Sequence, residues 1–423
     1  MAEPVPAPTR RPVSPATGGS ARRGPVSRAV AAVALWPWWV QLGLIWLGSR
    51  VLTTVMLLGF ARDQEVNPWT GASPSYADFA AMWDSRWYQI VAASGYPSEL
   101  PITDDGHVGE NAWAFMPVYP MVVRALTGLT GLGWAAAAVV VSVACATAAV
   151  FVLYRLLRLR LDHGTALVGA TLFSVAPVSP ILQLGYAESL HALLLVCSLL
   201  LVMRRNYLAA APLIVVASFT RPTGLAFSLF LLLLWIVRMV RRARAGFPVR
   251  ERWTLAVTAA LSGVAGLAWP AIAWAVTGSV TAYTDTELAW RSVYIGHQHL
   301  VPFAAWFQGL DWWTQRWVGV PLGWLVVPAL VALGVWGLRS RAGARMGIEV
   351  RLWLLSYGVY LLAVFFPQSS TFRLLLPLFP VVGMLAVPRS AAYRTALIAA
   401  CIVLQWWWID ACWRVDGADW TPP

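Results

Sequence analysis

One segment of the sequence places a carboxylate at the edge of an aromatic stripe. Between residues 77 and 91, large apolar side chains recur at helical spacing, at Phe79, Trp83, Trp87 and Ile90. This spacing predicts an amphipathic helix lying in a membrane interface. Asp84 lies beside the stripe, one turn before Tyr88, and partial desolvation there favours general-base chemistry. A solvated helix face with interfacial tryptophans is the simpler interpretation, and spacing alone favours it.

Three further charged residues lie where other apolar segments begin or end. Glu188 follows Tyr186 and opens an apolar run, where it either stabilises a helix N-terminus or contacts polar substrate groups. Arg221 occupies a Thr-Arg-Pro-Thr-Gly break between two short runs, and Arg373 follows a Ser-Ser-Thr stretch. An arginine there can snorkel to the interface or bind an anion. We predict the second role, phosphate binding, for both arginines.

A later polar segment, residues 278–319, contains carboxylates, aromatic residues and two histidines. Glu287 is its candidate substrate-binding residue. His297 and His299 form a His-x-His pair, which alone is common in loops and does not define a metal site. No metal site is therefore assigned from the sequence, and a divalent cation as cofactor is left open.

The composition requires these residues to be positioned by membrane helices. Of 423 residues, 59% are hydrophobic and 12% are charged, too few charged residues for the surface of a soluble protein of this size. The basic residues, all arginine, lie at helix ends and not on one surface, so the net charge of +12 does not indicate nucleic-acid binding. The chain also lacks a P-loop, a Rossmann fingerprint and an evident internal repeat. The predicted fold class is an all-α polytopic membrane protein.

About eleven apolar segments are candidates to span the bilayer. They are 38–61, 134–154, 165–183, 187–203, 207–220, 222–240, 254–277, 320–338, 351–366, 372–388 and 392–410. Loops on alternate sides contain 22 of the arginines, and the positive-inside rule assigns those loops to the cytoplasm. The N-terminus is then cytoplasmic and the C-terminus extracytoplasmic.

This topology divides the chain into three parts. Residues 1–35 are predicted to be a disordered cytoplasmic tail, 36–410 a transmembrane catalytic domain, and 411–423 an extracytoplasmic tail. Two long extracytoplasmic loops, 62–133 and 278–319, belong to the central part. The model of alternating charge requires that 113–131, which contains Pro117 and Pro120, does not span the bilayer.

Several short motifs resemble one known family in their order along residues 40–390. They are Trp83-Asp84 followed by Gly95-Tyr96, then Ala114-Phe115-Met116-Pro117-Val118-Tyr119-Pro120, Gly185-Tyr186-Ala187-Glu188-Ser189, Arg204-Arg205, Ala217 through Gly224, and Ser370-Thr371-Phe372-Arg373 with Pro377-Leu378-Phe379-Pro380. Together they resemble the GPI mannosyltransferase 2 (PIG-V-like) family of integral-membrane glycosyltransferases in the GT-C superfamily. Each motif alone is weakly specific.

The resemblance implies an inverting transfer of a sugar, usually mannose, from a polyprenyl-phosphate donor to an extracytoplasmic hydroxyl acceptor. The catalytic base then falls on Asp84, with Asp78 as the alternative. The resemblance also implies that no second catalytic carboxylate is needed, because a phosphate leaving group requires little help from a general acid. The expected substrate-binding residues are Trp83, Tyr88, Tyr186, Glu188 and Glu287.

Two other functions remain open at this stage, a transporter or flippase for a lipid-linked precursor and a non-catalytic membrane partner. A transporter should have charged residues in the middle of its spans, whereas the charged residues here lie at their outer ends. The expected partners are the lipid donor, a glycolipid or other hydroxyl acceptor, and the bilayer of a plasma membrane. The sequence does not identify the acceptor, the oligomeric state or a partner subunit.

Overall fold

A computed structural model describes residues 35–416 and 421–423. Apart from Leu35, the predicted cytoplasmic tail lies outside the described residues. The chain divides into a unit of residues 1–41 and a unit of residues 42–423. The described part of the first contains the start of helix α2 (Trp38–Arg62), where the Gln41 amide donates to the Trp36 carbonyl oxygen at 2.8 Å. The second unit contains the remaining helices and the candidate site.

Helices make up all the regular elements of the described residues, apart from one isolated bridge between Ile102 and Val108. Five of these helices are long and apolar enough to cross a membrane: α2, α6 (Trp134–Leu157), α12 (Val249–Thr277), α17 (Gly347–Val364) and α20 (Ala391–Cys412). A sixth candidate is the pair α14 (Ala305–Val318) and α15 (Gly323–Arg339), which is bent by 114°. The predicted all-α polytopic class is confirmed, and the chain is a multi-pass membrane protein. The count of about eleven spans stays a prediction.

Four shorter apolar helices coincide with or overlap other predicted spans. They are α7 (His163–Val175), α8 (Glu188–Met203), α9 (Tyr207–Ser218) and α10 (Gly224–Val240). The predicted 113–131 segment is helix α5 (Val118–Thr130), which is too short to be a candidate span. Helix α7 has the same length of 13 residues, so the expectation that 113–131 does not cross the bilayer stays a prediction.

Two predicted spans are broken in the structure. Residues 372–388 form the short helices α18 (Thr371–Leu374), η3 (Leu376–Leu378) and α19 (Val381–Ala386) instead of one helix. Pro377 and Pro380 account for these breaks, because proline lacks the N–H that continues a helical hydrogen-bond ladder. Residues 165–183 likewise divide into α7 and η2 (Ser179–Gln183), with Pro180 at the start of η2.

A buried arginine compensates for the break after α7. Arg50, in the middle of α2, donates to the Ser174 carbonyl oxygen at 2.5 Å and the Ser179 carbonyl oxygen at 2.9 Å. It also donates to the Gln183 side chain at 3.1 Å, and its guanidinium carbon lies 4.5 Å from the centre of the Trp46 ring. Among the described residues no carboxylate forms an ion pair with Arg50. The cation thus donates to backbone carbonyls on both sides of the break, where the helical hydrogen-bond ladder is interrupted.

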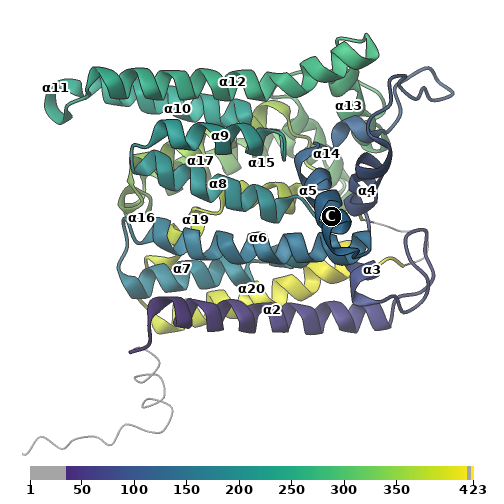
Figure 1. The fold of residues 1–423 in the computed structure, drawn as a ribbon, viewed down its shortest axis with the longest axis horizontal. Helices are drawn as coiled ribbons and strands as arrows, with labels where there is room; N and C mark the ends of the chain where they lie inside the picture. The colour runs from purple at the N-terminus through teal and green to yellow at the C-terminus, as the bar shows by residue number, and fades with distance from the viewer. Residues whose placement is uncertain (1–34, 417–420) are drawn as a thin grey trace, which may run out of the picture. The chain divides into compact units, whose positions relative to one another are not determined.

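Short helices, formed mostly by the two long loops, lie together at one end of the helical bundle. They are α3 (Tyr76–Ala80), α4 (Asp84–Ser94), η1 (Ala112–Ala114), α5 and α13 (Ala282–Ile295). The short helices α11 (Arg242–Ala245) and α16 (Arg341–Arg345) lie at the opposite end from α3, α4 and α13 (Figure 1). The arginine-rich turns and the two long loops therefore occupy opposite ends of the helices, as the charge pattern predicts for opposite sides of a membrane.

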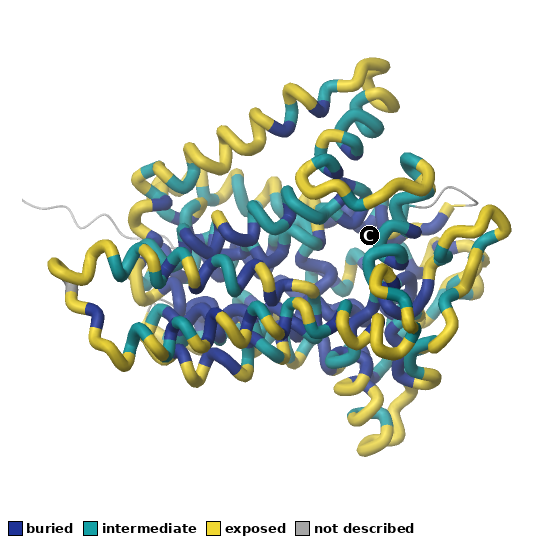
Figure 2. The backbone as a smooth tube through the Cα atoms, turned by 90° about the horizontal axis from the view of Figure 1, so that it is seen from above, coloured by how far each residue is buried: buried dark blue, intermediate teal, exposed yellow. Residues whose placement is uncertain are grey.

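Burial separates the inner helices from the outer helices. Buried residues concentrate along the inner helices, and exposed residues lie on the outer faces (Figure 2). The outer faces are themselves apolar: α12 exposes Leu261 and Val264, and α15 exposes Leu333 and Trp336. Apolar residues on the outside of a helical bundle suit contact with lipid chains.

Candidate functional site

Asp84 is positioned by a break in the helix predicted across residues 77–91. The prediction of one continuous helix was wrong, because α3 ends at Ala80 and α4 begins at Asp84. At the break, residues of the 184–187 segment form hydrogen bonds with the backbone of the first loop. Gly185 donates its N–H to the Ala80 carbonyl oxygen at 2.9 Å, and the Asp84 N–H donates to the Tyr186 hydroxyl at 3.2 Å. These bonds replace helical ones.

Backbone strain accompanies this break. Trp83 has a φ of 58°, a conformation that costs of the order of 1–3 kcal/mol for a residue other than glycine. Strain of this kind concentrates at functional sites. The turn at Trp83 places Asp84 at the first position of α4.

Two carboxylates and two guanidinium groups meet at this point. One Asp84 carboxylate oxygen lies 2.5 Å from an Arg373 nitrogen and 3.7 Å from an Arg221 nitrogen. One Glu188 oxygen lies 2.5 Å from Arg221 and 3.1 Å from Arg373. Each acid therefore faces both arginines. The sequence placed Asp84 beside an aromatic stripe and the other three residues at the ends of apolar segments, with the two arginines expected to bind one phosphate. The structure brings all four residues together.

This four-residue cluster, which we call the charge cluster, is largely shielded from solvent. The exposed side-chain fraction is 4% for Glu188, 9% for Arg373, 14% for Arg221 and 16% for Asp84. The pairing is not complete: Glu188 Oε2 and the Nε atoms of Arg221 and Arg373 are buried without a hydrogen-bond partner among the described residues. Buried polar atoms normally have partners, so these three are available to a ligand.

Close helix packing brings the arginine-bearing segments inward. A Cβ atom on Gly224 would lie 2.6 Å from the Gly266 backbone, so α10 and α12 approach closely just after Arg221. A Cβ atom on Gly185 would lie 2.6 Å from Ser85 Oγ. Only glycine permits these two approaches, and both occur within three residues of a member of the charge cluster.

Two buried tyrosines border the charge cluster. The Arg373 guanidinium carbon lies 5.2 Å from the centre of the Tyr186 ring, and that of Arg221 lies 5.9 Å from the Tyr88 ring. Burial raises the pKa of both tyrosine hydroxyls well above their ordinary value. Both side chains therefore remain neutral at physiological pH, and their rings pack against the two guanidinium groups instead of acting as bases.

A third carboxylate, Glu287 on α13, is electrostatically coupled to the charge cluster. Burial raises the pKa of the Glu287 carboxyl, and the charge of Asp84 acts in the same direction. The Arg291 charge and a hydrogen bond with the Tyr283 hydroxyl oppose this shift. Glu287 thus retains its proton to a higher pH than an ordinary glutamate.

A single cavity connects these groups. It has a volume of about 1010 Å³, at the upper end of the range for ligand pockets. All four charge-cluster residues line it, as does Glu287. Apolar residues line most of the remaining wall, among them Leu225, Leu267, Leu288, Val293 and Leu361. The cavity therefore suits a ligand with an anionic group attached to an apolar chain.

Of the remaining predicted site residues, Trp83 lies at the cavity and Asp78 does not. Trp83 lines the cavity, and its ring centre lies 4.3 Å from that of Trp69. Asp78 lies on the exposed first turn of α3, where the Ser75 hydroxyl donates to it at 2.6 Å and the Asp78 N–H donates back to Ser75 at 3.3 Å. It does not line the cavity. This arrangement is that of a helix-capping residue.

Some cavity residues were not singled out by sequence reasoning. His191 follows Glu188 by one helical turn, is 3% exposed and lines the cavity, as do Tyr357 and Tyr360 on α17. An ionisable residue inside an apolar span is a signal of a functional site, so His191 could have been found. The two tyrosines lie in an ordinary apolar pattern and gave no such signal.

The cavity combines groups for anion binding with groups for proton acceptance. Guanidinium groups bind phosphate oxygens with paired hydrogen bonds, and the two arginines face the same point. A carboxylate beside them can accept a proton. Among the described residues, the one group of three metal-ligating side chains lies outside this cavity. The arrangement is therefore suited to holding a phosphate next to a proton acceptor.

Comparison with known proteins gives structural similarities only. No protein-family model matches the chain, and no match is found among curated proteins. The chain is similar to ArnT from Cupriavidus metallidurans bound to undecaprenyl phosphate, with a TM-score of 0.47 and 16% sequence identity over 84% of the chain. It is also similar to an Archaeoglobus fulgidus oligosaccharyltransferase in complex with zinc and sulfate, with a TM-score of 0.44 and 13% identity over 84% of the chain. The chain spans 63% of the length of the first and 52% of the second.

Proposed function

We propose that this protein is a GT-C-type inverting glycosyltransferase that moves mannose from a polyprenyl-phosphate donor to an extracytoplasmic hydroxyl acceptor. The observation that carries the proposal is the convergence of Asp84, Glu188, Arg221 and Arg373 in one apolar-walled cavity. The sequence resemblance to the PIG-V-like family supports the choice of mannose. The separation of the arginine-rich turns from the long loops supports an extracytoplasmic site in a plasma membrane, with the N-terminus in the cytoplasm.

Donor binding uses the two arginines. The phosphate of the donor binds Arg221 and Arg373, whose buried Nε atoms have no partner among the described residues. The polyprenyl chain extends along the apolar wall. Glu188 is the most buried acid of the charge cluster and contacts both arginines, so its role is to hold the two guanidinium groups in position. Trp83 and Glu287, which line the cavity, complete the substrate contacts, and Tyr88 and Tyr186 pack against the two guanidinium groups.

Binding of the phosphate prepares the base. In the structure one Asp84 carboxylate oxygen lies 2.5 Å from an Arg373 nitrogen. A phosphate competes for that guanidinium and releases Asp84, while Arg373 keeps its contact with Glu188. Asp84 then accepts the proton of the acceptor hydroxyl as the acceptor oxygen bonds to the anomeric carbon. The bond between that carbon and the phosphate oxygen breaks, and the phosphate leaves with the electron pair.

The proposal is tested with purified protein in proteoliposomes. Polyprenyl phosphates carrying radiolabelled mannose or glucose are supplied with membrane lipids and proteins as acceptors, and transferred label is measured. We expect transfer from the mannose donor, at a rate well above that from the glucose donor. Equal use of both would refute the sugar assignment. Movement of intact donor across the bilayer without transfer would instead identify a flippase, and inactivity in both assays would leave a membrane partner.

A further inference from the structure

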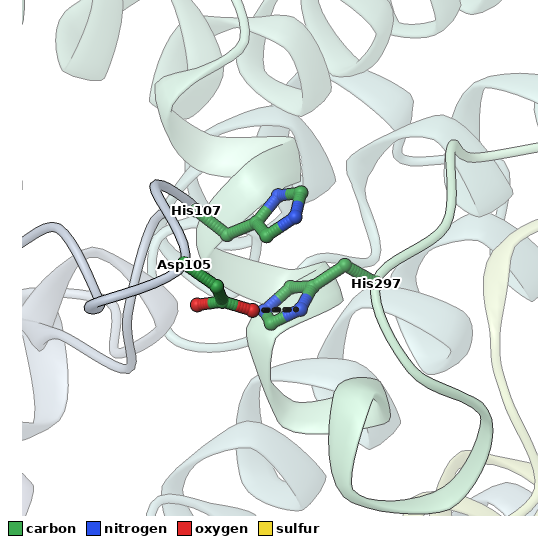
Figure 3. Close-up of side chains that lie close together, drawn as sticks. All are labelled: Asp105, His107 and His297. Atoms are coloured by element: carbon green, nitrogen blue, oxygen red, sulfur yellow. Dashed lines mark ion pairs between the residues drawn. The ribbon is translucent and has the colours of Figure 1, made fainter.

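A cluster of metal-ligating side chains lies outside the cavity, where the two long loops meet. It contains Asp105 and His107 from the first loop and His297 from the second (Figure 3). Asp105 Oδ2 lies 3.5 Å from His297 Nδ1. The two imidazole rings are stacked, with centres 4.0 Å apart and planes within 8°. One ligand atom from each of the three residues lies within 4.8 Å of the other two.

The first-loop ligands are fixed on a tight hairpin. The Thr103 N–H donates to the His107 carbonyl oxygen at 2.8 Å, and the Thr103 hydroxyl donates to Asp105 at 2.6 Å. Gly106 has a φ of 82°, a left-handed conformation that glycine adopts without strain. The hairpin therefore presents the carboxylate and the imidazole on either side of one turn.

His297 is fixed at the end of α13. The helix ends at Ile295 and is capped by Gly296, which has a φ of 69° and donates its N–H to the Ser292 carbonyl oxygen at 2.9 Å. After His297, the Gln298 side chain donates to the Ile295 carbonyl oxygen at 3.2 Å and accepts from Gln308 at 2.7 Å. Both halves of the cluster are thus held by hydrogen bonds that do not involve the ligand atoms of the histidines.

We propose that Asp105, His107 and His297 bind a divalent transition-metal ion of the zinc class. Two imidazoles and one carboxylate are donors that zinc prefers, and water completes a tetrahedral shell at an exposed site. Zinc–ligand distances of about 2.0–2.1 Å place tetrahedral donor atoms roughly 3.3 Å apart. Atoms already within 4.8 Å reach this spacing by side-chain rotation, since all three residues are exposed.

The metal joins the two loops that border the cavity. Glu110 follows the hairpin and lines the cavity, and Leu300 follows His297 and also lines it. None of the three metal ligands itself lines the cavity, so the ion does not take part in the transfer reaction. It stabilises the relative position of the first and second long loops, a role that is independent of the proposed transferase activity.

The test is metal binding by the full-length protein, purified in detergent without a polyhistidine tag. Titration with Zn²⁺ against a chromophoric chelator should show one strong site in the wild type. Replacing any one ligand, by His107→Ala, Asp105→Asn or His297→Ala, should weaken it by at least about tenfold. His299→Ala is the matched control, because His299 lies two residues from His297 and is not part of the cluster.

A second pair of measurements separates coordination from unfolding. Co²⁺ should give visible absorption bands with the wild type that His297→Ala abolishes, and His297→Cys should restore binding because thiolate is also a zinc ligand. Zn²⁺ should raise the melting temperature of the wild type, His299→Ala and His297→Cys, and leave that of His107→Ala, Asp105→Asn and His297→Ala unchanged. Equal Zn²⁺ affinity in the wild type and His297→Ala would overturn the proposal, as would an equal loss in His299→Ala.

Discussion

The exchange Glu188→Gln tests whether Glu188 is the counter-ion that holds both arginines. Glutamine keeps the side-chain volume and one carbonyl oxygen but removes the charge. In the structure one Glu188 oxygen lies 2.5 Å from Arg221 and 3.1 Å from Arg373. Removing one partner of a buried ion pair costs about 3–5 kcal/mol. In this variant Asp84 still lies 2.5 Å from Arg373 but 3.7 Å from Arg221. Arg221 therefore loses its close partner whereas Arg373 keeps one, so we expect a cost at the lower end of the range, about 3 kcal/mol.

The matched comparison is Asp84→Asn, which removes the other carboxylate. After that change both arginines retain Glu188, so the expected cost is smaller, about 1.5 kcal/mol for one charged hydrogen bond. At roughly 1–2 °C per kcal/mol for a chain of this size, Glu188→Gln should lower the melting temperature by about 3–6 °C and Asp84→Asn by about half as much. Transfer activity should show the opposite order, because Asp84 is the proposed base.

The assay measures thermal unfolding in detergent at one fixed scan rate, alongside transfer by equal amounts of folded protein. The reasoning predicts that the variant with the larger loss of stability has the smaller loss of activity. If Glu188→Gln unfolded at the wild-type temperature, or if Asp84→Asn were the less stable variant, the assignment of Glu188 as the structural counter-ion would be refuted.

Three other changes test the donor site, the coupled glutamate and the topology. Arg373→Lys keeps the charge but loses bidentate phosphate binding, so the KM for the polyprenyl-phosphate donor should rise about tenfold with the protein still folded. Burial raises the pKa of Glu287; its protonated form therefore stabilises the fold fully below about pH 4.3, and this contribution is lost as pH rises through the raised pKa. The melting temperature of the wild type should accordingly fall relative to Glu287→Gln across that window, and a constant difference would contradict this. In a cysteine-free background, a membrane-impermeant thiol reagent should label Asp104→Cys but not Arg241→Cys from outside the cell, and the reverse pattern would invert the topology.

The sequence was sufficient for the fold class because its signals are local and repeated. Apolar segments of spanning length and arginines in alternate loops each report directly on membrane insertion. The breaks were harder to predict. The break before Asp84 results from hydrogen bonds to Gly185 and Tyr186, about a hundred residues away, and no local pattern indicates them.

Sequence reasoning predicted that Arg221 and Arg373 converge on the donor phosphate, but not which carboxylates the two arginines contact. Arg221 and Arg373 each lie beside a break in an apolar segment, which a single sequence shows. That both face Asp84 and Glu188 depends on helix packing, which it does not show. His297 illustrates the same limit: the sequence pairs it with His299, whereas its structural neighbours are Asp105 and His107 from the other loop. Arg50 and His191 were overlooked although a charged or ionisable residue within a span is itself a signal.

The most direct test of the account measures donor binding and mannosyl transfer together in Asp84→Asn, with Asp78→Asn as the control. Asp84→Asn removes the proton acceptor and leaves both arginines in place, so it should bind polyprenyl-phosphate mannose at least as tightly as the wild type. Its transfer rate should fall by about two to four orders of magnitude. Asp78→Asn, changed on the exposed turn of α3, should bind and transfer normally. Near-normal transfer by Asp84→Asn, or loss of transfer in Asp78→Asn alone, would contradict the assignment of Asp84 as the catalytic base.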